Sequence, residues 1–429
     1  MAVGYGEAAL VVPEGTPMGG YVDRPGPSTG VLDPLQVSAV TWSAGGRRFA
    51  LVVADVICVN DDLVQRVRRE AGCELWLAAS HTHAGPETGC VPGGGPTPGP
   101  WAEAIAAACR SAVQAAVAGE RPCEGGAHRG ELRGVGADRS RPDAEAVVPL
   151  DVIAVRDGGL VGVVVVLPVH PTVLPASNRM VSADLVGAVR RRLRERLGGQ
   201  VWVVVATGAA GDISTRHTRR GQDAAELDRL GDVVAARCIE LLAEPATPAW
   251  PSAAPAPHSS RSLSPSEAPI DTDADVAGMA PVEVAWVGRR LALRRATVAV
   301  DVDSLVADVE RAAADPVAAR LARSRLEGVR ARTSATGPIG VEVSVARLGD
   351  LLLVGLPGEP FLAVAASIAD SGAGQPTVVL GYVNGYPGYL PTADAYARPE
   401  YEVLASQVAP GSAELLAATA RDLLAEVSS

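Results

Sequence analysis

The stretch Glu74-Leu-Trp-Leu-Ala-Ala-Ser-His-Thr-His-Ala-Gly-Pro86 joins an apolar run to two histidines that stand one residue apart. Residues 75–79 have the length and residue types of a strand, and Gly85-Pro86 interrupts it. If the strand continued through His81 and His83, alternation would place both rings on one face of the sheet. Two neutral imidazoles on one face suit zinc, or one metal ligand beside one proton donor. The pattern therefore predicts a metal site at a strand end, with two polar residues at the end of an ordinary strand as the alternative.

The chain is long enough for a large apolar core, and it is acidic. It has 429 residues and a formal net charge of −11, and its arginines are scattered instead of gathered in a stripe. This distribution argues against nucleic acid and anionic membranes as partners. We therefore expect a small-molecule substrate, while a homo-oligomer stays open.

Cysteine usage and the N-terminus predict a cytoplasmic location. The six cysteines include no CxxC pair, and we expect them to be reduced. The N-terminus lacks a basic region followed by an apolar core, and no apolar run approaches the roughly 18 residues of a membrane span. Membrane insertion is therefore not expected.

The order of apolar runs predicts an α/β fold of mixed sheets flanked by helices. Strands are expected at residues 37–42, 48–57, 74–79, 150–155, 160–169, 201–206, 340–346, 351–356 and 377–382. Helices are expected at residues 61–71, 101–118, 185–197, 361–371 and 413–427, with one long or two short helices at 304–332. A Pro/Ala/Ser-rich excursion is expected at about 244–270, and no internal repeat is apparent.

Polar residues recur in the loops that follow several of these strands. Besides the two histidines, they are His170 before Pro171, Ser214 in Gly-Asp-Ile-Ser, and Glu359 in Pro-Gly-Glu-Pro. A lone His before Pro is more often structural, and a Glu at that position is equally explained by a helix N-terminus. However, α/β proteins place their chemistry in loops at strand ends. The shared placement predicts a common site.

Tyrosines are concentrated in one late segment. Five of the seven, Tyr382, Tyr386, Tyr389, Tyr396 and Tyr401, fall in a single Gly/Pro-rich stretch. A buried Tyr needs a partner for its hydroxyl, so such a loop indicates a ligand-facing wall or a subunit contact.

Taken in order, these motifs resemble the neutral/alkaline (non-lysosomal) ceramidase family. The matching segments are Ser80-His-Thr-His-Ala-Gly-Pro86, His170-Pro-Thr-Val-Leu, Gly211-Asp-Ile-Ser214, Pro357-Gly-Glu359 and Gly388-Tyr-Leu-Pro-Thr392. The resemblance covers nearly the whole chain. It implies that residues 1–429 form a single neutral-ceramidase-like catalytic domain.

The resemblance also implies one zinc ion, held by His81, His170, Glu359 and Tyr389. Tyr389 is chosen because the ligand Tyr of the family precedes a second active-site Tyr by twelve residues, and Tyr401 stands at that distance. Such a site acidifies a water molecule towards neutral pH for attack on a carbonyl.

Four further residues match the substrate-facing positions of the family. His83 is expected to carry a proton to the leaving amine, while Ser214, Tyr401 and Arg139 are expected to polarise or hold the oxyanion. Whether Ser214 acts instead as a covalent nucleophile stays open.

The chain also departs from ceramidases that act outside cells, which are longer and carry an export signal and an additional C-terminal β-sandwich. It has Thr215-Arg216 where ceramidases tend to carry Pro-Asn, and only 3% of its residues are aromatic. We therefore expect a cytoplasmic, bacterial-type member limited to the catalytic domain, a zinc amidase acting on a small or polar N-acyl amine. A true ceramidase and a non-catalytic, metal-stabilised binding protein are the alternatives.

Three arginines follow Ser214 closely, at positions 216, 219 and 220. They could recognise an acid group of the substrate. For at least two of them, a solvated helix start is the more ordinary role.

Overall fold

The computed structural model describes residues 1–91, 93–250, 283–296, 301–334, 336–371, 374–398 and 400–428. The larger part of the excursion expected at about 244–270 lies outside these residues. Within them, the predicted α/β fold of mixed sheets and flanking helices is confirmed.

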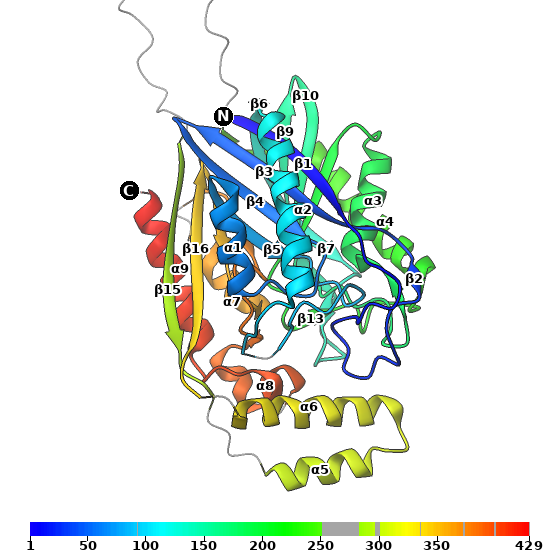
Figure 1. Cartoon of the computed structure of the whole chain (residues 1–429). Helices are drawn as coiled ribbons and strands as arrows, with labels where there is room; N and C mark the ends of the chain where they lie inside the picture. Colours follow the sequence, from blue (N-terminus) through cyan, green and yellow to red (C-terminus); the bar gives the residue numbers. More distant parts are fainter. Residues whose placement is uncertain are drawn as a thin grey trace, which may run out of the picture.

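The first sheet has the strand order β5-β4-β3-β1-β6. Its strands are β1 (Ala2–Leu10), β3 (Leu35–Ala44), β4 (Arg47–Ala54), β5 (Glu74–Ala79) and β6 (Arg121–Pro122). β4 pairs antiparallel with β3, and helix α1 (Asp61–Ala71) carries the chain across to β5, which pairs parallel with β4. α1 begins with two aspartates and ends at Gly72 in the left-handed conformation, as helix ends favour. Helix α2 (Gly99–Ala118) packs on β1 and β3 (Figure 1).

The second sheet has the strand order β12-β10-β9-β7-β14. Its strands are β7 (Glu124–Arg133), β9 (Val147–Asp157), β10 (Gly159–Leu167), β12 (Trp202–Thr207) and β14 (Thr247–Trp250). β9 and β10 form the expected hairpin, and helix α3 (Asp184–Arg196) leads to β12, which pairs parallel with β10. Helix α4 (Ala224–Ala243) packs beside α3.

The third sheet has the strand order β15-β16-β17-β19. Its strands are β15 (Val284–Leu293), β16 (Ile339–Leu348), β17 (Leu351–Gly355) and β19 (Thr377–Leu380). Helix α7 (Leu362–Ala369) connects the parallel pair β17 and β19, and helix α9 (Ser412–Ser428) packs against β15 and β16.

One connectivity therefore occurs in all three sheets. An antiparallel hairpin continues through a helix into a strand parallel to its second strand, as β3-β4-α1-β5, β9-β10-α3-β12 and β16-β17-α7-β19. The sequence shows no repeat because the recurrence lies in the topology. The strands β5, β10, β12 and β17 lead directly into the loops that carry the polar motifs.

A shared apolar core lies between the three sheets. It includes Trp42, Phe49 and Trp76 from the first, Val164, Val166 and Val204 from the second, and Leu351, Leu353 and Val378 from the third. Separate clusters pack the outer faces against α1 and α2, against α3 and α4, and against α7 and α9. Burial of both faces explains why a strand such as β10 is a continuous β-branched run.

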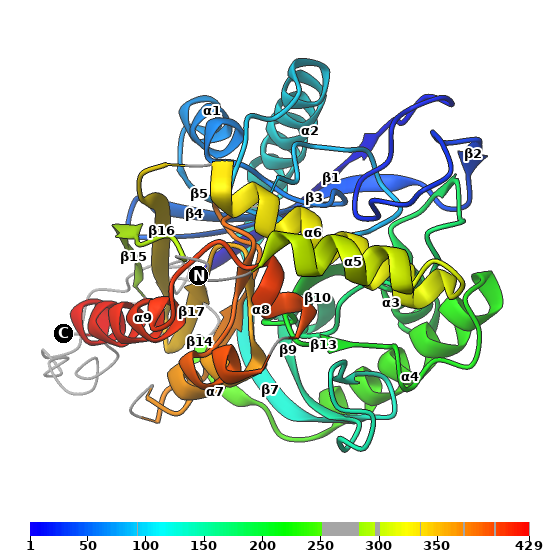
Figure 2. The same ribbon diagram turned by 90° about the horizontal axis from the view of Figure 1, so that it is seen from below.

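Short ladders and helices complete the end of the molecule where these loops gather. The ladders are β2 (Gly30–Val31) with β11 (Met180–Val181), β8 (Ala137–Asp138) with β13 (Ile213–Ser214), and β18 (Glu359–Pro360) with β20 (Tyr389–Leu390). The short helices are η1 (Ala393–Ala397) and α8 (Tyr401–Ala405). Two helices, α5 (Val302–Arg311) and α6 (Pro316–Ser334), lie across this end, and α6 packs on α8 (Figure 2).

Candidate metal centre

His81 lies in the first residues beyond β5. The strand ends at Ala79, and His81 has a left-handed backbone with φ 62° while its N–H donates to the Val56 carbonyl at 3.0 Å. Its Nδ1 lies 2.6 Å from the Ile57 carbonyl oxygen. Because a carbonyl oxygen only accepts hydrogen bonds, Nδ1 carries the proton and Nε2 keeps its lone pair.

His170 follows β10, and its ring, like that of His81, directs Nδ1 to a backbone carbonyl oxygen. Its backbone N–H donates to the Ile213 carbonyl at 3.0 Å, and its Nδ1 lies 3.2 Å from the Ala210 carbonyl oxygen. The loop after β12 therefore fixes this ring from two sides and leaves its Nε2 free to bind a cation.

His83 packs against the N-terminal loop. A Cβ atom at Gly20, which has φ +92°, would lie 2.5 Å from His83 Nδ1, so only glycine permits this approach. On the same side, the ring centre of Tyr21 lies 4.9 Å from that of His83.

The three rings direct one nitrogen each to a common point. His81 Nε2 lies 3.1 Å from His170 Nε2 and 3.3 Å from His83 Nε2, and His83 Nε2 lies 3.0 Å from His170 Nε2. His81 and His170 are buried, and His83 is half-buried.

A carboxylate completes this group. Glu359 Oε2 lies 3.3 Å from His81 Nε2 and 3.8 Å from His170 Nε2. Its other oxygen, Oε1, accepts a hydrogen bond of 2.6 Å from the hydroxyl of Tyr386. Among the residues that the structure describes, Oε2 has no hydrogen-bond partner, although Glu359 is only 1% exposed. A buried carboxylate oxygen without a donor requires an explanation.

A tetrahedral cation accounts for the arrangement. Ligand atoms bound at about 2.1 Å to such an ion stand about 3.4 Å apart, close to the separations in this group. Without a cation, the ring nitrogens of His81 and His170 and the carboxylate oxygen would face one another as acceptors. The donor set of imidazole nitrogens and one carboxylate is one that zinc accepts.

Electrostatics favour the ligand forms of these groups. Burial lowers the pKa of His83 and His170 well below the ordinary value, and nearby charges including Arg139 lower both further. Burial alone would raise the pKa of Glu359, but His81 and the Tyr386 hydroxyl hold it below its usual value. Near pH 7, the site therefore offers neutral rings of His83 and His170 and an ionised carboxylate of Glu359.

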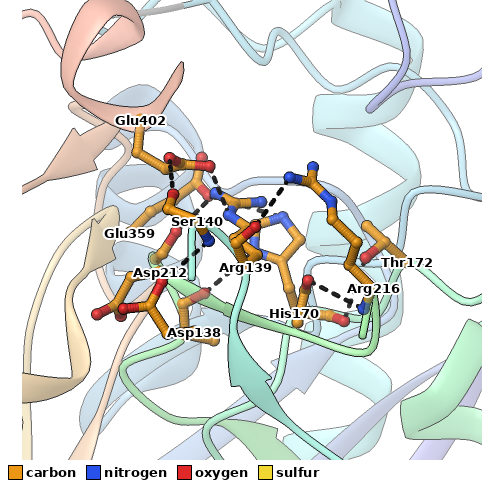
Figure 3. A network of polar contacts seen from close by, with 12 residues as sticks. Asp138, Arg139, Ser140, His170, Thr172, Asp212, Arg216, Glu359 and Glu402 are labelled. Atoms are coloured by element: carbon orange, nitrogen blue, oxygen red, sulfur yellow. Dashed lines mark hydrogen bonds and ion pairs between the residues drawn. The ribbon is translucent and has the colours of Figure 1, made fainter. Parts of the chain in front are cut away.

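A buried ion pair flanks the metal group. Arg139 Nε lies 2.6 Å from Glu402 Oε1, and its Nη2 donates to the Gly211 carbonyl at 2.6 Å (Figure 3). The guanidinium carbon lies 5.2 Å from the ring centre of Tyr389. Burial opposes the charge, but Glu402, Tyr389 and Glu359 raise the pKa of Arg139 well above its ordinary value. A fixed positive charge therefore stands beside the group.

Ser214 and Tyr401 lie in the same region. Ser214 pairs with His170 in an isolated bridge, and its Oγ accepts a hydrogen bond of 3.3 Å from the backbone N–H of Arg216. The ring centres of Tyr401 and Tyr389 lie 5.8 Å apart, and burial raises the pKa of Tyr401 to about 12.

Comparisons with known proteins identify the architecture. No protein-family model matches the chain, and no curated protein sequence matches it. A solved structure of the neutral ceramidase from Pseudomonas aeruginosa matches with a TM-score of 0.73 and 17% identity, over 99% of this chain and 74% of that one. A ceramidase complexed with C2 matches with a TM-score of 0.72 and 17% identity, over 100% and 75% of the two chains. The fold is neutral-ceramidase-like.

Within this ceramidase-like fold, the predicted site residues meet at one end of the molecule, but two positions differ from expectation. His83 Nε2 lies in the same group as the two expected histidine ligands instead of apart from them. The phenol that contacts Glu359 is that of Tyr386, whereas Tyr389 is the register partner of Glu359 in the β18–β20 ladder. The roles of His83 and Tyr389 stay predictions.

Two supporting residues were not among the predicted site residues. The ring of Tyr382 packs 4.4 Å from that of His81. Asp184 accepts hydrogen bonds of 3.0 Å from the N–H groups of Val173 and Leu174, and so holds the loop that follows His170. Tyr382 belonged to the predicted tyrosine segment, and nothing distinguished it from its neighbours.

Among the residues that the structure describes, no helix combines the length and hydropathy that crossing a bilayer requires.

Proposed function

We propose that this protein is a zinc-dependent hydrolase that cleaves the linear amide bond of a small or polar N-acyl amine. The observation that carries the proposal is the convergence of three imidazole nitrogens and one unpartnered carboxylate oxygen beside a fixed guanidinium. We also propose that residues 1–429 act as one catalytic domain, and that the protein works in the cytoplasm.

We assign the zinc ligands to His81, His83, His170 and Glu359. With these four ligands, zinc bound there would have to become five-coordinate to take up a water molecule, which it would then acidify, or to polarise the substrate carbonyl. The Ile57 and Ala210 carbonyls hold two of the rings in the required tautomer, and Tyr386 orients Glu359 through its second oxygen.

The remaining polar groups suit stabilisation of the transition state. Arg139 keeps its charge and is anchored by Glu402, so it can stabilise an oxyanion without first reorganising. The Ser214 Oγ accepts from a backbone N–H, which leaves its own proton to donate to the substrate. Tyr401 keeps its phenolic proton near pH 7 because burial raises its pKa, and it can donate in the same way.

The role of His83 separates two versions of the proposal. The separations of its Nε2 from the other two ring nitrogens, 3.3 and 3.0 Å, favour a ligand. The family resemblance favours a proton carrier, with Tyr389 as the fourth ligand. Measurement of zinc binding by variants of both residues decides between them.

The size of the substrate is the second open choice. The structural neighbours are ceramidases, which favours a lipid amide. Among the described residues, however, the exposed large apolar side chains are Val11, Val22, Val31, Leu32, Val91 and Leu415. None of them is aromatic, and a surface that docks on lipid usually carries aromatic residues. We therefore prefer a small or polar amide.

The test is hydrolysis of matched amides by the zinc-loaded protein. Short-chain N-acyl amines and long-chain ceramide are compared before chelation, after chelation and after zinc is restored. We expect cleavage of the short amides, loss on chelation and recovery with zinc. His81→Ala should abolish cleavage, whereas His128→Gln, in β7 and outside the metal group, should retain it.

Each contrary result has a distinct meaning. Faster turnover of long-chain ceramide would establish the ceramidase alternative. Full activity after removal of zinc would refute the metal mechanism. A protein that retains zinc but cleaves no amide, and whose affinity for small-molecule amides is unchanged in His83→Ala, would be a binding protein.

A further inference from the structure

The loop after Ser214 carries two arginines against the segments that build the site. Arg216 Nη1 donates to the backbone carbonyl of Arg139 at 3.1 Å, and Arg219 Nη1 donates to that of Thr172 at 2.7 Å. Figure 3 shows the side chain of Arg216 running alongside His170 towards Arg139. Both guanidinium groups are therefore held beside the proposed metal group by backbone carbonyls.

Neither arginine has a carboxylate partner among the described residues. Other arginines of the chain commonly do, including Arg48, Arg68, Arg129, Arg139, Arg190 and Arg229. The chain has 49 acidic residues and 38 basic ones, so acidic partners are not scarce. Arg216 and Arg219 are thus among the arginines whose charge no ion pair balances within the described residues.

The surroundings balance the charges of the two guanidinium groups only in part. Burial is the largest influence and lowers the pKa of both. Arg139 and Arg219 lower the pKa of Arg216 further while Glu402 raises it, and Asp184 and Glu226 raise that of Arg219. Both stay charged at neutral pH because arginine starts from a very high pKa. A carboxylate bound to their free N–H donors would form charge-assisted hydrogen bonds that neither arginine makes among the described residues.

Two other nearby arginines, Arg139 and Arg24, are already engaged by groups of the protein. Arg139 is paired with Glu402, and Arg24 donates to the carbonyls of Asn178, Gly19 and His83. Arg220 is exposed, and only its backbone N–H is bonded, to Glu226. Arg216 and Arg219 each use one of five guanidinium donors on the protein, and the others remain for a ligand.

We propose that Arg216 and Arg219 bind a carboxylate of the substrate, so that the preferred substrates are anionic N-acyl amines. The inference rests on the proposed amidase function and narrows its substrate class. It separates this chain from a ceramidase, because an N-acyl sphingoid base carries no such charge. The carboxylate belongs either to the amine part, as in an N-acyl amino acid, or to the acyl part, as in the monoamide of a dicarboxylic acid.

The test compares acids with their neutral carboxamides. N-acyl amino acids and dicarboxylic monoamides are each assayed beside the corresponding carboxamide, with zinc-loaded protein at low and high salt. We expect kcat/KM to be about 10- to 100-fold higher for the acid of one pair, mostly through KM, since hydrogen bonds to charged groups contribute on that scale. If the N-acyl amino acids show the preference, the carboxylate belongs to the amine part of the substrate. If the dicarboxylic monoamides show it, the carboxylate belongs to the acyl part.

Three matched variants locate the anion site. Arg216→Gln and Arg219→Gln should each lower kcat/KM for the preferred acid by about tenfold or more and leave its carboxamide within a few-fold. Arg220→Gln removes the same charge from the same loop and should leave the preference unchanged. If all three variants lowered kcat/KM for the acid equally, the arginines would contribute only a general positive surface charge. That result would overturn the inference.

A binding measurement separates this inference from the proposed function. N-sulfonyl amino acids and sulfonyl analogues of the monoamides resist hydrolysis, and calorimetry measures their affinity against their carboxamides whether or not amides are cleaved. Tighter binding of an acid, lost in Arg216→Gln, supports the anion site even if no amide is hydrolysed. Cleavage of neutral amides at least as fast as acids, with equal binding of both analogues, would overturn the anion site and leave the amidase proposal intact.

Discussion

Backbone carbonyls, more than side chains, set the chemistry of individual residues at the metal group. The Ile57 and Ala210 carbonyls fix the tautomers of His81 and His170, and a hydroxyl from the tyrosine loop occupies the outer oxygen of Glu359. Three of the four proposed ligands, His81, His170 and Glu359, are thus oriented by a second group before any ion binds. Such preorganisation is expected to raise metal affinity.

The first prediction concerns the ligand set. His83→Ala should weaken zinc binding by more than about 100-fold, because loss of a direct ligand exceeds the loss of an orienting partner. Tyr389→Phe should leave zinc affinity nearly unchanged. Competition titration against a zinc-binding dye measures both. The reverse pattern, with tight zinc in His83→Ala and weak zinc in Tyr389→Phe, would restore the expectation drawn from the family resemblance.

The second prediction concerns the partner of Glu359. Tyr386→Phe removes only the hydroxyl that donates to Oε1 at 2.6 Å, and should weaken zinc binding by about 10- to 100-fold. The same dye competition measures it. Tyr396→Phe is the matched control, because its hydroxyl donates to the Val408 carbonyl in the outer cluster. If both variants bind zinc as the parent does, the hydroxyl does not orient the ligand.

At the scale of elements, short ladders bring distant segments together. β18 pairs with β20, which sets Glu359 opposite Tyr389, and β8 pairs with β13, which sets Arg139 beside the Ser214 loop. The loop between His170 and α3 is held differently, through the carboxylate of Asp184. Burial raises the pKa of Asp184 to about 6.

The third prediction follows from that pKa. An unfolded Asp titrates near its model value of 3.8, so between about pH 4 and 6 the folded chain holds a proton that the unfolded chain has lost. This raised pKa makes the contribution of Asp184 to stability fall as pH rises, by about 1.4 kcal/mol per pH unit in that window. Asp184→Asn removes this term.

Denaturant titrations of the parent and Asp184→Asn at pH 4, 5, 6 and 7 measure the effect. The variant should be the less stable protein at pH 4, because its amide NH2 would face an N–H donor at the position where the protonated carboxyl of Asp184 still offers a second oxygen. The gap in unfolding free energy should narrow as pH rises to 6. A gap that is constant with pH would show that Asp184 is ionised throughout.

At the scale of the whole molecule, contacts across the chain fix the site. Arg139, which follows β8, pairs with Glu402 of α8, and the side chains are 6% and 1% exposed. Breaking a buried pair on one side leaves an uncompensated charge. The pair therefore links the middle of the chain to its last quarter.

The fourth prediction tests that link. Glu402→Gln should lower the unfolding free energy by about 3 kcal/mol, and it should reduce hydrolysis because Arg139 loses its anchor. The double variant Arg139→Leu with Glu402→Leu should regain stability without regaining activity, since apolar pairs often replace buried ion pairs without loss. Chemical denaturation and amide hydrolysis supply the two readouts. A double variant as active as the parent would exclude Arg139 from catalysis.

Much of the architecture could be predicted from the sequence. Residues 304–332 were expected to form one long or two short helices, and they contribute to two, α5 and α6. β1 was not expected, because Gly4 and Gly6 weaken its strand pattern. These two glycines have no side chains, and this allows the backbone of α2 to pack closely on β1. The threefold recurrence of the hairpin and crossover was also missed, since topology leaves no trace in residue spacing.

The candidate site was predictable as a set of residues but not as a geometry. The motif order brought His81, His83, His170 and Glu359 together correctly. It could not reveal that His83 turns its Nε2 to the group, because that rotation depends on contacts with Gly20 and Tyr21 in the N-terminal loop. Nor could it distinguish Tyr386 from its neighbours, because loop closure decides which hydroxyl reaches Glu359.

Anomalous diffraction at the zinc edge from crystals of the zinc-loaded protein tests the central claim most directly. The account predicts one strong peak among His81, His83, His170 and Glu359, bonded to the three Nε2 atoms and to Oε2 at about 2.0–2.2 Å. Absence of a peak within bonding distance of these ring nitrogens in fully loaded crystals would contradict it.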